Sequence, residues 1–210
     1  MTNPRRALIL IDVQQQYFDG TLEIHYPPHA DSLPRILVAI DAAEASGIPI
    51  VAFQHSGGEG APLFAPGTPE FELHPEIEAR ATDEWTRITK SYSSVYAGTG
   101  LAEWLRERDL DTVALVGYMT NNCVLASSVE AEFLGFTTEV LSDATGAINI
   151  ANSAGFASAQ TVHTTLMALL NSNLATVATT EAWTAALADG QPLEASNLIE
   201  SATTGASRAV

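Results

Sequence analysis

The sequence predicts an α/β fold: a three-layer α/β/α sandwich around a mostly parallel, six-stranded, Rossmann-like sheet. Two observations predict this class. Short apolar runs alternate with segments of helical spacing along most of the chain, and such alternation favours parallel strands joined by crossover helices. The first of these runs, residues 7–11, is also apolar without a break, which is typical of a strand that is covered by helices on both faces.

Strands and helices are expected to alternate along most of the chain. Six segments are predicted as strands: residues 7–11, 48–53, 85–90, 112–116, 137–141 and 174–178. Five segments have apolar residues at helical spacing and are predicted as helices: residues 33–45, 101–108, 122–134, 151–170 and 180–188. Gly47 and Gly135 stand where the first and third of these helices are expected to end, as helix-terminating glycines do.

The chain of 210 residues has the length of one domain with a sizeable core. Residues 1–190 are predicted to form that domain. Residues 191–210 are small, polar and without pattern, and are predicted to form a flexible C-terminal tail. Two long loops, 19–29 and 56–76, are expected either to cover a site or to contact a neighbouring subunit.

Composition excludes several classes of function. The formal net charge is −16, so nucleic acid and anionic membrane surfaces are not expected as partners. One cysteine excludes an internal disulfide and a multi-cysteine metal site. No apolar run reaches the length of a membrane span, and the basic start before residue 7 lacks the features of a signal peptide. A cytoplasmic enzyme is therefore expected.

Three polar side chains stand at the ends of predicted strands. Asp12 follows the first strand, Lys90 ends the third, and Cys123 follows the fourth after a tight turn. The carboxyl ends of parallel strands share one edge of the sheet, where ligands bind in open α/β folds. Cys123 also falls in the first turn of a helix, where backbone N–H groups and the helix dipole favour a thiolate and an oxyanion.

Each of these residues alone has an ordinary structural interpretation. A free cysteine is often a small buried hydrophobe, an aspartate at a strand end often binds nearby backbone, and a lysine is usually solvated. Together they provide a base, a cation and a nucleophile. The three residues therefore predict a nucleophilic site jointly, and none predicts it by itself.

Three segments carry a resemblance to a known family: Leu8 to Gln14, Lys90 to Leu101 and Val116 to Val124. In their order and spacing they resemble the isochorismatase-like cysteine hydrolases, which include nicotinamidases and other small-amide hydrolases. The similarity runs from Ala7 to about Leu187. It implies the isochorismatase-like hydrolase fold and a homo-oligomer, a dimer or a larger assembly.

The resemblance also implies a mechanism. Asp12 would be the general base toward Cys123, whose thiolate would attack a carboxamide carbonyl and form a thioester, and Lys90 would steady Asp12 and the developing charges. The oxyanion would be held by the backbone N–H groups of Met119 and Cys123. The Tyr118–Met119 peptide bond is expected to be cis.

No metal and no cofactor are expected. The five histidines form no recognised metal motif. Nicotinamidases carry Asp-x-His after the second strand, whereas this chain has Phe53 and His55. Because Phe53 replaces the Asp of that motif, nicotinamidase activity is not expected either.

Four residues are candidates for substrate binding: Tyr17, Phe18, Gln54 and Tyr118. Each could equally belong to the core or to an interface. The leading functional hypothesis is a metal-independent cysteine hydrolase that cleaves the C–N bond of a small amide, lactam or carbamoyl compound. One alternative is an isochorismatase-type hydrolysis of a vinyl ether with Asp12 as the acid. Another is a non-catalytic α/β binding module that uses the same edge of the sheet.

Overall fold

The structure is a computed structural model that describes residues 3–208. Within these residues the main sheet has six strands in the order β3-β2-β1-β4-β5-β8, and every neighbouring pair is parallel. The bounds are β1 Arg6–Ile11, β2 Ile50–His55, β3 Thr86–Lys90, β4 Thr112–Tyr118, β5 Thr137–Gly146 and β8 Thr176–Ala178. The predicted fold class is confirmed.

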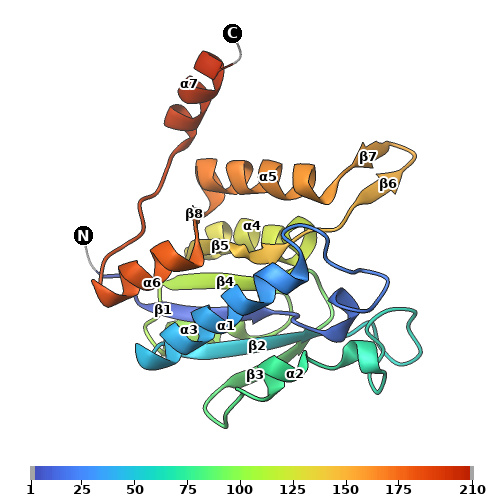
Figure 1. The fold of residues 1–210 in the computed structure, drawn as a ribbon. Helices are drawn as coiled ribbons and strands as arrows, with labels where there is room; N and C mark the ends of the chain where they lie inside the picture. Colours follow the sequence, from blue (N-terminus) through green and yellow to red (C-terminus); the bar gives the residue numbers. More distant parts are fainter. Residues whose placement is uncertain (1–2, 209–210) are drawn as a thin grey trace.

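Helices cover both faces of this sheet (Figure 1). Side chains of β1 alternate between two hydrophobic clusters, with Leu8 and Leu10 in one and Ile9 and Ile11 in the other. Helices α1 (His29–Ala45) and α6 (Thr180–Ala188) contribute to the first cluster, and α3 (Leu101–Glu107), α4 (Leu125–Leu134) and α5 (Ala159–Leu169) to the second. The short elements η1 Gln15–Tyr17, η2 Pro69–Phe71 and α2 Pro75–Glu78 lie in the loops.

The strand order creates one switch point, between β1 and β4. From β1 the chain builds β2 and β3 on one side, and then returns to build β4, β5 and β8 on the other. Such a switch point opens a crevice at the carboxyl ends of the strands. The register pairs Ile11 with Gly117, so the end of β1 lies beside the turn that follows β4.

Gly117 permits the close approach of these two strands. Its φ is 101°, in a region that side chains with a Cβ rarely adopt. A Cβ at this position would overlap the carbonyl oxygen of Ile11 on the neighbouring strand. Glycine is therefore required at position 117 for two reasons: the backbone conformation and the lack of space for a side chain beside β1.

We expect Gly117→Ala to lower the free energy of unfolding by about 2–5 kcal/mol, the sum of the costs of a left-handed backbone and of an overlap with neighbouring backbone. Gly135→Ala is the matched control, because Gly135 has a φ of 81° and nothing within 4 Å of an added Cβ. That control should lose only about 1–2 kcal/mol. Denaturant unfolding of both variants checks this, and equal losses would contradict the overlap.

The prediction of a helix over residues 151–170 is wrong for its first part. A hairpin of β6 (Ile150–Asn152) and β7 (Gly155–Ala157) stands there, and α5 begins only at Ala159. The Asn152 side chain accepts a hydrogen bond from Ala154 N at 2.8 Å and supports a turn, and Ser158 Oγ caps the helix by accepting from Thr161 N at 3.2 Å. Local side-chain bonds to the backbone outweigh the apolar spacing.

The segment after residue 190 is not without structure. Residues Leu198–Arg208 form helix α7, which extends away from the sheet in Figure 1. Asn197 Oδ1 accepts a hydrogen bond from Glu200 N at 2.9 Å, and this cap was not recognised in the sequence. The sequence analysis had predicted no helix here, and the domain boundary and the flexibility of the tail stay predictions.

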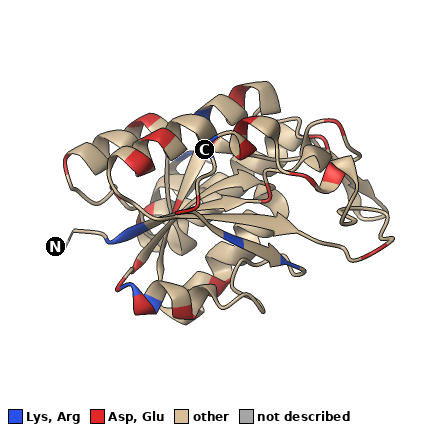
Figure 2. Ribbon diagram, turned by 90° about the horizontal axis from the view of Figure 1, so that it is seen from below, with Lys and Arg blue, Asp and Glu red and all other residues tan. Residues whose placement is uncertain are grey.

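Acidic residues are spread over the outer elements of the fold (Figure 2). Among residues 3–208 none of the helices combines the length and apolar character that crossing a membrane would require.

Candidate active site

Asp12 stands directly after β1 and is fully buried. Its φ of 50° turns the chain at the end of the strand. Its backbone N–H still donates to Phe53 O on β2 at 3.1 Å, and its carbonyl accepts from Gln14 N at 2.7 Å. The carboxylate is thereby held at the carboxyl edge of the sheet, where the sequence predicted it.

Lys90 lies at the end of β3 and reaches across β2 to Asp12. Its Nζ is 2.7 Å from Asp12 Oδ2, and the side chains of both residues have no exposed surface. The same ammonium donates to Cys123 Sγ at 3.3 Å and to the carbonyl oxygen of Tyr92 at 3.1 Å. A buried carboxylate needs such a partner, because desolvation of an isolated charge is costly.

Cys123 lies in a single π-helical turn, η3 (Thr120–Val124), between β4 and α4. It is buried, and its carbonyl accepts a hydrogen bond from Ser127 Oγ at 2.6 Å. Burial, followed by the Asp12 carboxylate, raises the pKa of the thiol to about 12, although Lys90 acts in the opposite direction. The resting residue is therefore a thiol, in contrast to the thiolate that the helix terminus alone favours.

The backbone before Cys123 has the form that the family resemblance implied. The Tyr118–Met119 peptide bond is cis. Met119 is extended and precedes the π-helical turn. N–H groups in the first turn of a helix lack carbonyl partners within the helix, and Cys123 stands in this turn. The role of the Met119 and Cys123 amides as an oxyanion hole belongs to the proposed mechanism.

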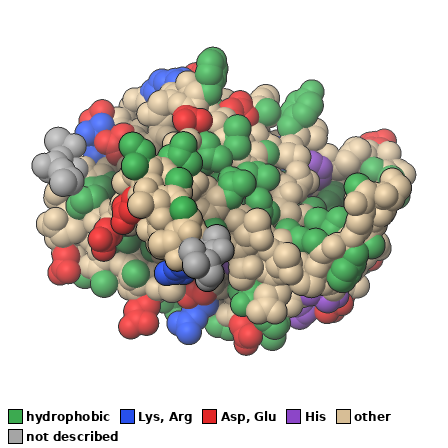
Figure 3. Space-filling view, turned by 90° about the horizontal axis from the view of Figure 1, so that it is seen from above, with side chains coloured by type: hydrophobic (Ala, Val, Ile, Leu, Met, Phe, Trp, Pro, Cys, Tyr) green, Lys and Arg blue, Asp and Glu red, His purple; other side chains and the backbone are tan. Residues whose placement is uncertain are grey.

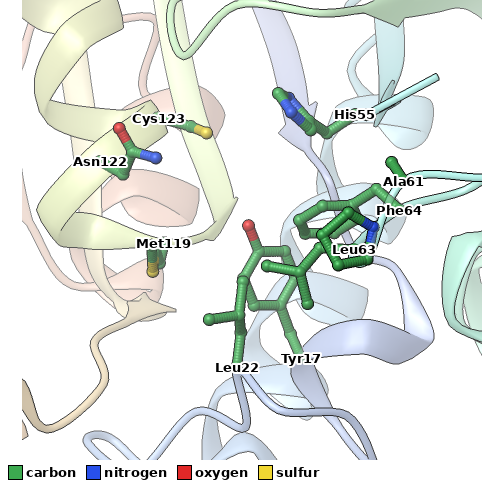
Figure 4. Close-up of a pocket in the computed structure, with 11 residues that line it drawn as sticks. Tyr17, Leu22, His55, Ala61, Leu63, Phe64, Met119, Asn122 and Cys123 are labelled. Atoms are coloured by element: carbon green, nitrogen blue, oxygen red, sulfur yellow. The ribbon is translucent and has the colours of Figure 1, made fainter.

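A cavity of about 500 Å³ opens above the cysteine. Figure 4 shows the Cys123 sulfur and the His55 imidazole facing one another across it, with the Tyr17 hydroxyl pointing toward the space between them. The lining residues are Tyr17, Leu22, His55, Gly57, Ala61, Pro62, Leu63, Phe64, Met119, Asn122 and Cys123. Most of the wall is apolar, and none of these residues is Lys or Arg.

The four predicted substrate-binding residues divide between cavity and core. Tyr17 lines the cavity, and burial, with smaller contributions from Cys123 and Asp12, raises its pKa, so the hydroxyl keeps its proton. Tyr118 is buried and bonds through its hydroxyl to Ser32 Oγ at 2.8 Å. Gln54 donates to the Phe71 carbonyl. Phe18 packs against Tyr118 with ring centroids 5.7 Å apart. These last three do not line this cavity.

Sequence reasoning missed His55, Leu22 and Asn122 as lining residues. His55 ends β2 beside Lys90, so the rule that pointed to the other strand ends could have found it. Leu22 and residues 57–64 come from the two long loops that were expected to cover a site or contact a subunit. Their side chains close over the cavity here, but the irregular backbone of such loops has no pattern from which to predict it.

The residues present do not fit the metal site of nicotinamidases. Phe53 occupies the position of the motif's Asp and is buried in the core. His55 directs Nδ1 at the Lys90 ammonium, 3.3 Å away. In the part of the chain from 3 to 208, no three His, Cys, Asp or Glu side chains are grouped so that they could hold a metal ion.

Fold and site together describe an α/β protein with a buried acid, ammonium and thiol at the switch point of a parallel sheet. The Isochorismatase domain model matches residues 6–182, and the chain belongs to the isochorismatase family. It is 30% identical to the isochorismatase family protein YddQ of Bacillus subtilis, over 84% of this chain and 97% of that one.

Two other similarities bear on the site. The chain is 27% identical to the nicotinamidase/pyrazinamidase of Mycobacterium tuberculosis, with 69% of this chain and 88% of that one covered. It is 44% identical to a Burkholderia xenovorans LB400 protein that is classed with the isochorismatases. The crystal structure of that protein superimposes with a TM-score of 0.95 and covers 99% of both chains.

Proposed function

We propose that the protein is a cysteine-dependent hydrolase that cleaves a C–N amide bond of a small molecule through a thioester. One observation carries this proposal: Lys90 contacts both Asp12 and Cys123, at 2.7 and 3.3 Å, beside a cavity that the cysteine lines. Nucleophile, base and cation are then within reach of a bound carbonyl. A relative named nicotinamidase/pyrazinamidase supports an amide as the substrate.

In the first half-reaction Asp12 takes the proton of the Cys123 thiol as the sulfur attacks the amide carbonyl. The raised pKa of Cys123 makes this transfer necessary, because the resting thiol is a weak nucleophile. The backbone N–H groups of Met119 and Cys123 bind the oxyanion. The C–N bond then breaks, Asp12 returns the proton to the leaving amine, and the acyl group stays on sulfur.

In the second half-reaction Asp12 takes a proton from water, and the resulting hydroxide attacks the thioester. The C–S bond breaks, the carboxylic acid leaves, and the thiol regains its proton from Asp12. Lys90 keeps one positive charge beside the carboxylate whenever Asp12 is ionised. It therefore lowers the cost of a buried charge in the resting state and between the two half-reactions.

The alternative of a vinyl ether hydrolase would use Asp12 as the acid and needs no thiol. The cavity wall contains no Lys or Arg, which disfavours a dicarboxylate substrate since its two charges would be desolvated without partners. The presence of Cys123 on the wall favours acyl transfer. The binding module, in turn, gives no reason for a buried ammonium to contact a thiol.

The test is a panel of small amides, lactams, ureides and carbamoyl compounds, with the protein quenched in acid during turnover. We expect at least one compound to be hydrolysed and its acyl mass to be found on Cys123 by peptide mass spectrometry. The Cys123→Ala variant should show neither result. Hydrolysis without any adduct, at a rate that the variant retains, would contradict a thioester.

We also propose that the protein forms a homo-oligomer. Figure 3 shows hydrophobic side chains gathered on the face that is viewed from above. A large contiguous patch of exposed apolar surface is typical of an interface, and Phe133, Phe156 and Ile199 are 90%, 73% and 80% exposed. This expectation of the sequence analysis stays a proposal.

A further inference from the structure

His55 is placed at the cavity by the sheet itself. It is the last residue of β2 and pairs in register with Lys90 on β3. Gln14 holds its backbone on both sides, accepting from His55 N at 2.7 Å and donating to His55 O at 3.1 Å. The ring packs edge-on against Phe64, with centroids 5.1 Å apart. The sheet and Gln14 therefore fix the backbone of His55, and Phe64 of the 56–76 loop packs against its ring.

The contact with Lys90 selects one tautomer of this imidazole. Lys90 Nζ lies 3.3 Å from His55 Nδ1. An ammonium has no acceptor, so a proton on Nδ1 would point at the positively charged Nζ, and a neutral ring therefore carries its proton on Nε2. Burial, and then the charge of Lys90, lower the pKa of His55 against the weaker effect of Asp12. The ring stays neutral near pH 7, with Nε2–H as a donor.

Within residues 3–208 the Nε2–H group of His55 has no protein partner. The hydrogen bond of the ring is made by Nδ1. His55 lines the cavity with Cys123 and Tyr17, and its ring faces the sulfur in Figure 4. A polar group that is fixed on an otherwise apolar wall orients a ligand and discriminates between ligands. The reaction proposed above uses Asp12, Lys90 and Cys123 and leaves this donor without a role.

We propose that His55 determines specificity: its Nε2–H donates a hydrogen bond to an acceptor on the acyl part of the substrate, away from the scissile carbonyl. The substrate class is then a neutral small amide whose acyl group carries a ring nitrogen, a carbonyl or an ether oxygen. This inference rests on the proposed function, since the acyl group is defined by its bond to Cys123. The competing role for His55 is to accept from Lys90 and nothing more.

Two amide variants separate these roles. In His55→Asn the side-chain amide ends near the position of Nδ1, so it can still accept from Lys90 but cannot replace Nε2–H. In His55→Gln the amide reaches the position of Nε2 and can donate into the cavity. Recognition through Nε2–H predicts that His55→Gln preserves selectivity between ligands and that His55→Asn loses it. A role confined to Lys90 predicts unchanged selectivity in His55→Asn.

The probes are benzaldehyde and the three isomeric pyridine carbaldehydes. An aldehyde adds reversibly to a cysteine: a C–S bond forms and the thiol proton passes to the carbonyl oxygen, so binding is measured without turnover. The readout is the dissociation constant of each aldehyde, obtained from protection of Cys123 against alkylation by iodoacetamide. For each protein we divide the dissociation constant of benzaldehyde by that of each pyridine isomer. Comparing this ratio between a variant and the wild type cancels the different electrophilicity of the probes.

We expect one pyridine isomer to lose about fivefold of its advantage over benzaldehyde in His55→Asn, the usual effect of one neutral hydrogen bond. His55→Gln should stay within about twofold of wild type. An unchanged ratio in His55→Asn, or a loss in His55→Gln alone, overturns the inference and leaves the hydrolase proposal intact. If no aldehyde protects Cys123 in the wild type, the nucleophilic role of Cys123 fails first, and the inference fails with it.

Discussion

Cys123→Ala is expected to lower kcat/KM for the best amide of the panel by at least about 10⁴-fold, as removal of a covalent nucleophile does. The change deletes one buried sulfur atom and leaves Asp12 and Lys90 in contact at 2.7 Å. Stability should therefore change little compared with activity. Steady-state kinetics and thermal unfolding on the same preparation check both parts.

Asp12→Asn is the companion variant, and the pair identifies the mechanism. A thioester mechanism needs both residues, so each variant should be inactive with amides. Isochorismatase-type chemistry needs Asp12 alone. An Asp12→Asn variant without activity beside a Cys123→Ala variant with nearly full activity would therefore contradict acyl transfer to sulfur and favour the vinyl ether reaction.

The second large effect is expected on stability. Lys90→Met should lower the free energy of unfolding by about 3–5 kcal/mol, because it leaves the Asp12 carboxylate charged and buried without a partner. Methionine retains most of the length of the lysine chain, so little packing is lost. Denaturant unfolding at pH 7 measures the change, and kcat should fall with it since Asp12 no longer has its cation.

Two controls show whether the buried charge is the cause. Arg87 lies on the same strand and pairs with Glu78 at 2.9 Å, with both side chains about half exposed, and Arg87→Met should cost no more than about 1 kcal/mol. In the double variant Asp12→Asn, Lys90→Met, part of the lost stability should return. Equal losses in the two single Met variants, or strict additivity in the double variant, would contradict the explanation.

The convergence of Asp12, Lys90 and Cys123 could be predicted because it depends on few choices. Unbroken apolar runs indicate strands covered on both faces, and alternating helices make those strands parallel. Parallel strands place their carboxyl ends at one edge whatever the loops do. A residue directly after such a run therefore has a predictable place, even when its partner lies more than a hundred positions away.

The hairpin at 150–157 and helix α7 could not be read from apolar spacing. Both depend on single side chains, Asn152, Ser158 and Asn197, that bond to nearby backbone. Removing one capping bond of this kind typically destabilises a helix by about 1 kcal/mol. In these places such bonds outweigh the apolar spacing and decide where an element begins. Their outcome depends on local geometry that a pattern of apolar residues does not contain.

By itself the sequence determined the parallel sheet, the edge at which the site lies, and the three side chains that meet there. It could do so because the apolar spacing of each segment and the order of strands and helices can be read directly from the chain. Only the tertiary structure decided the state of those groups. The raised pKa of Cys123 depends on burial and on the distance to Asp12, and the tautomer of His55 depends on a lysine from the neighbouring strand. Both effects arise because folding removes these groups from water and brings charges from distant parts of the chain together. A single stretch of sequence does not contain this information.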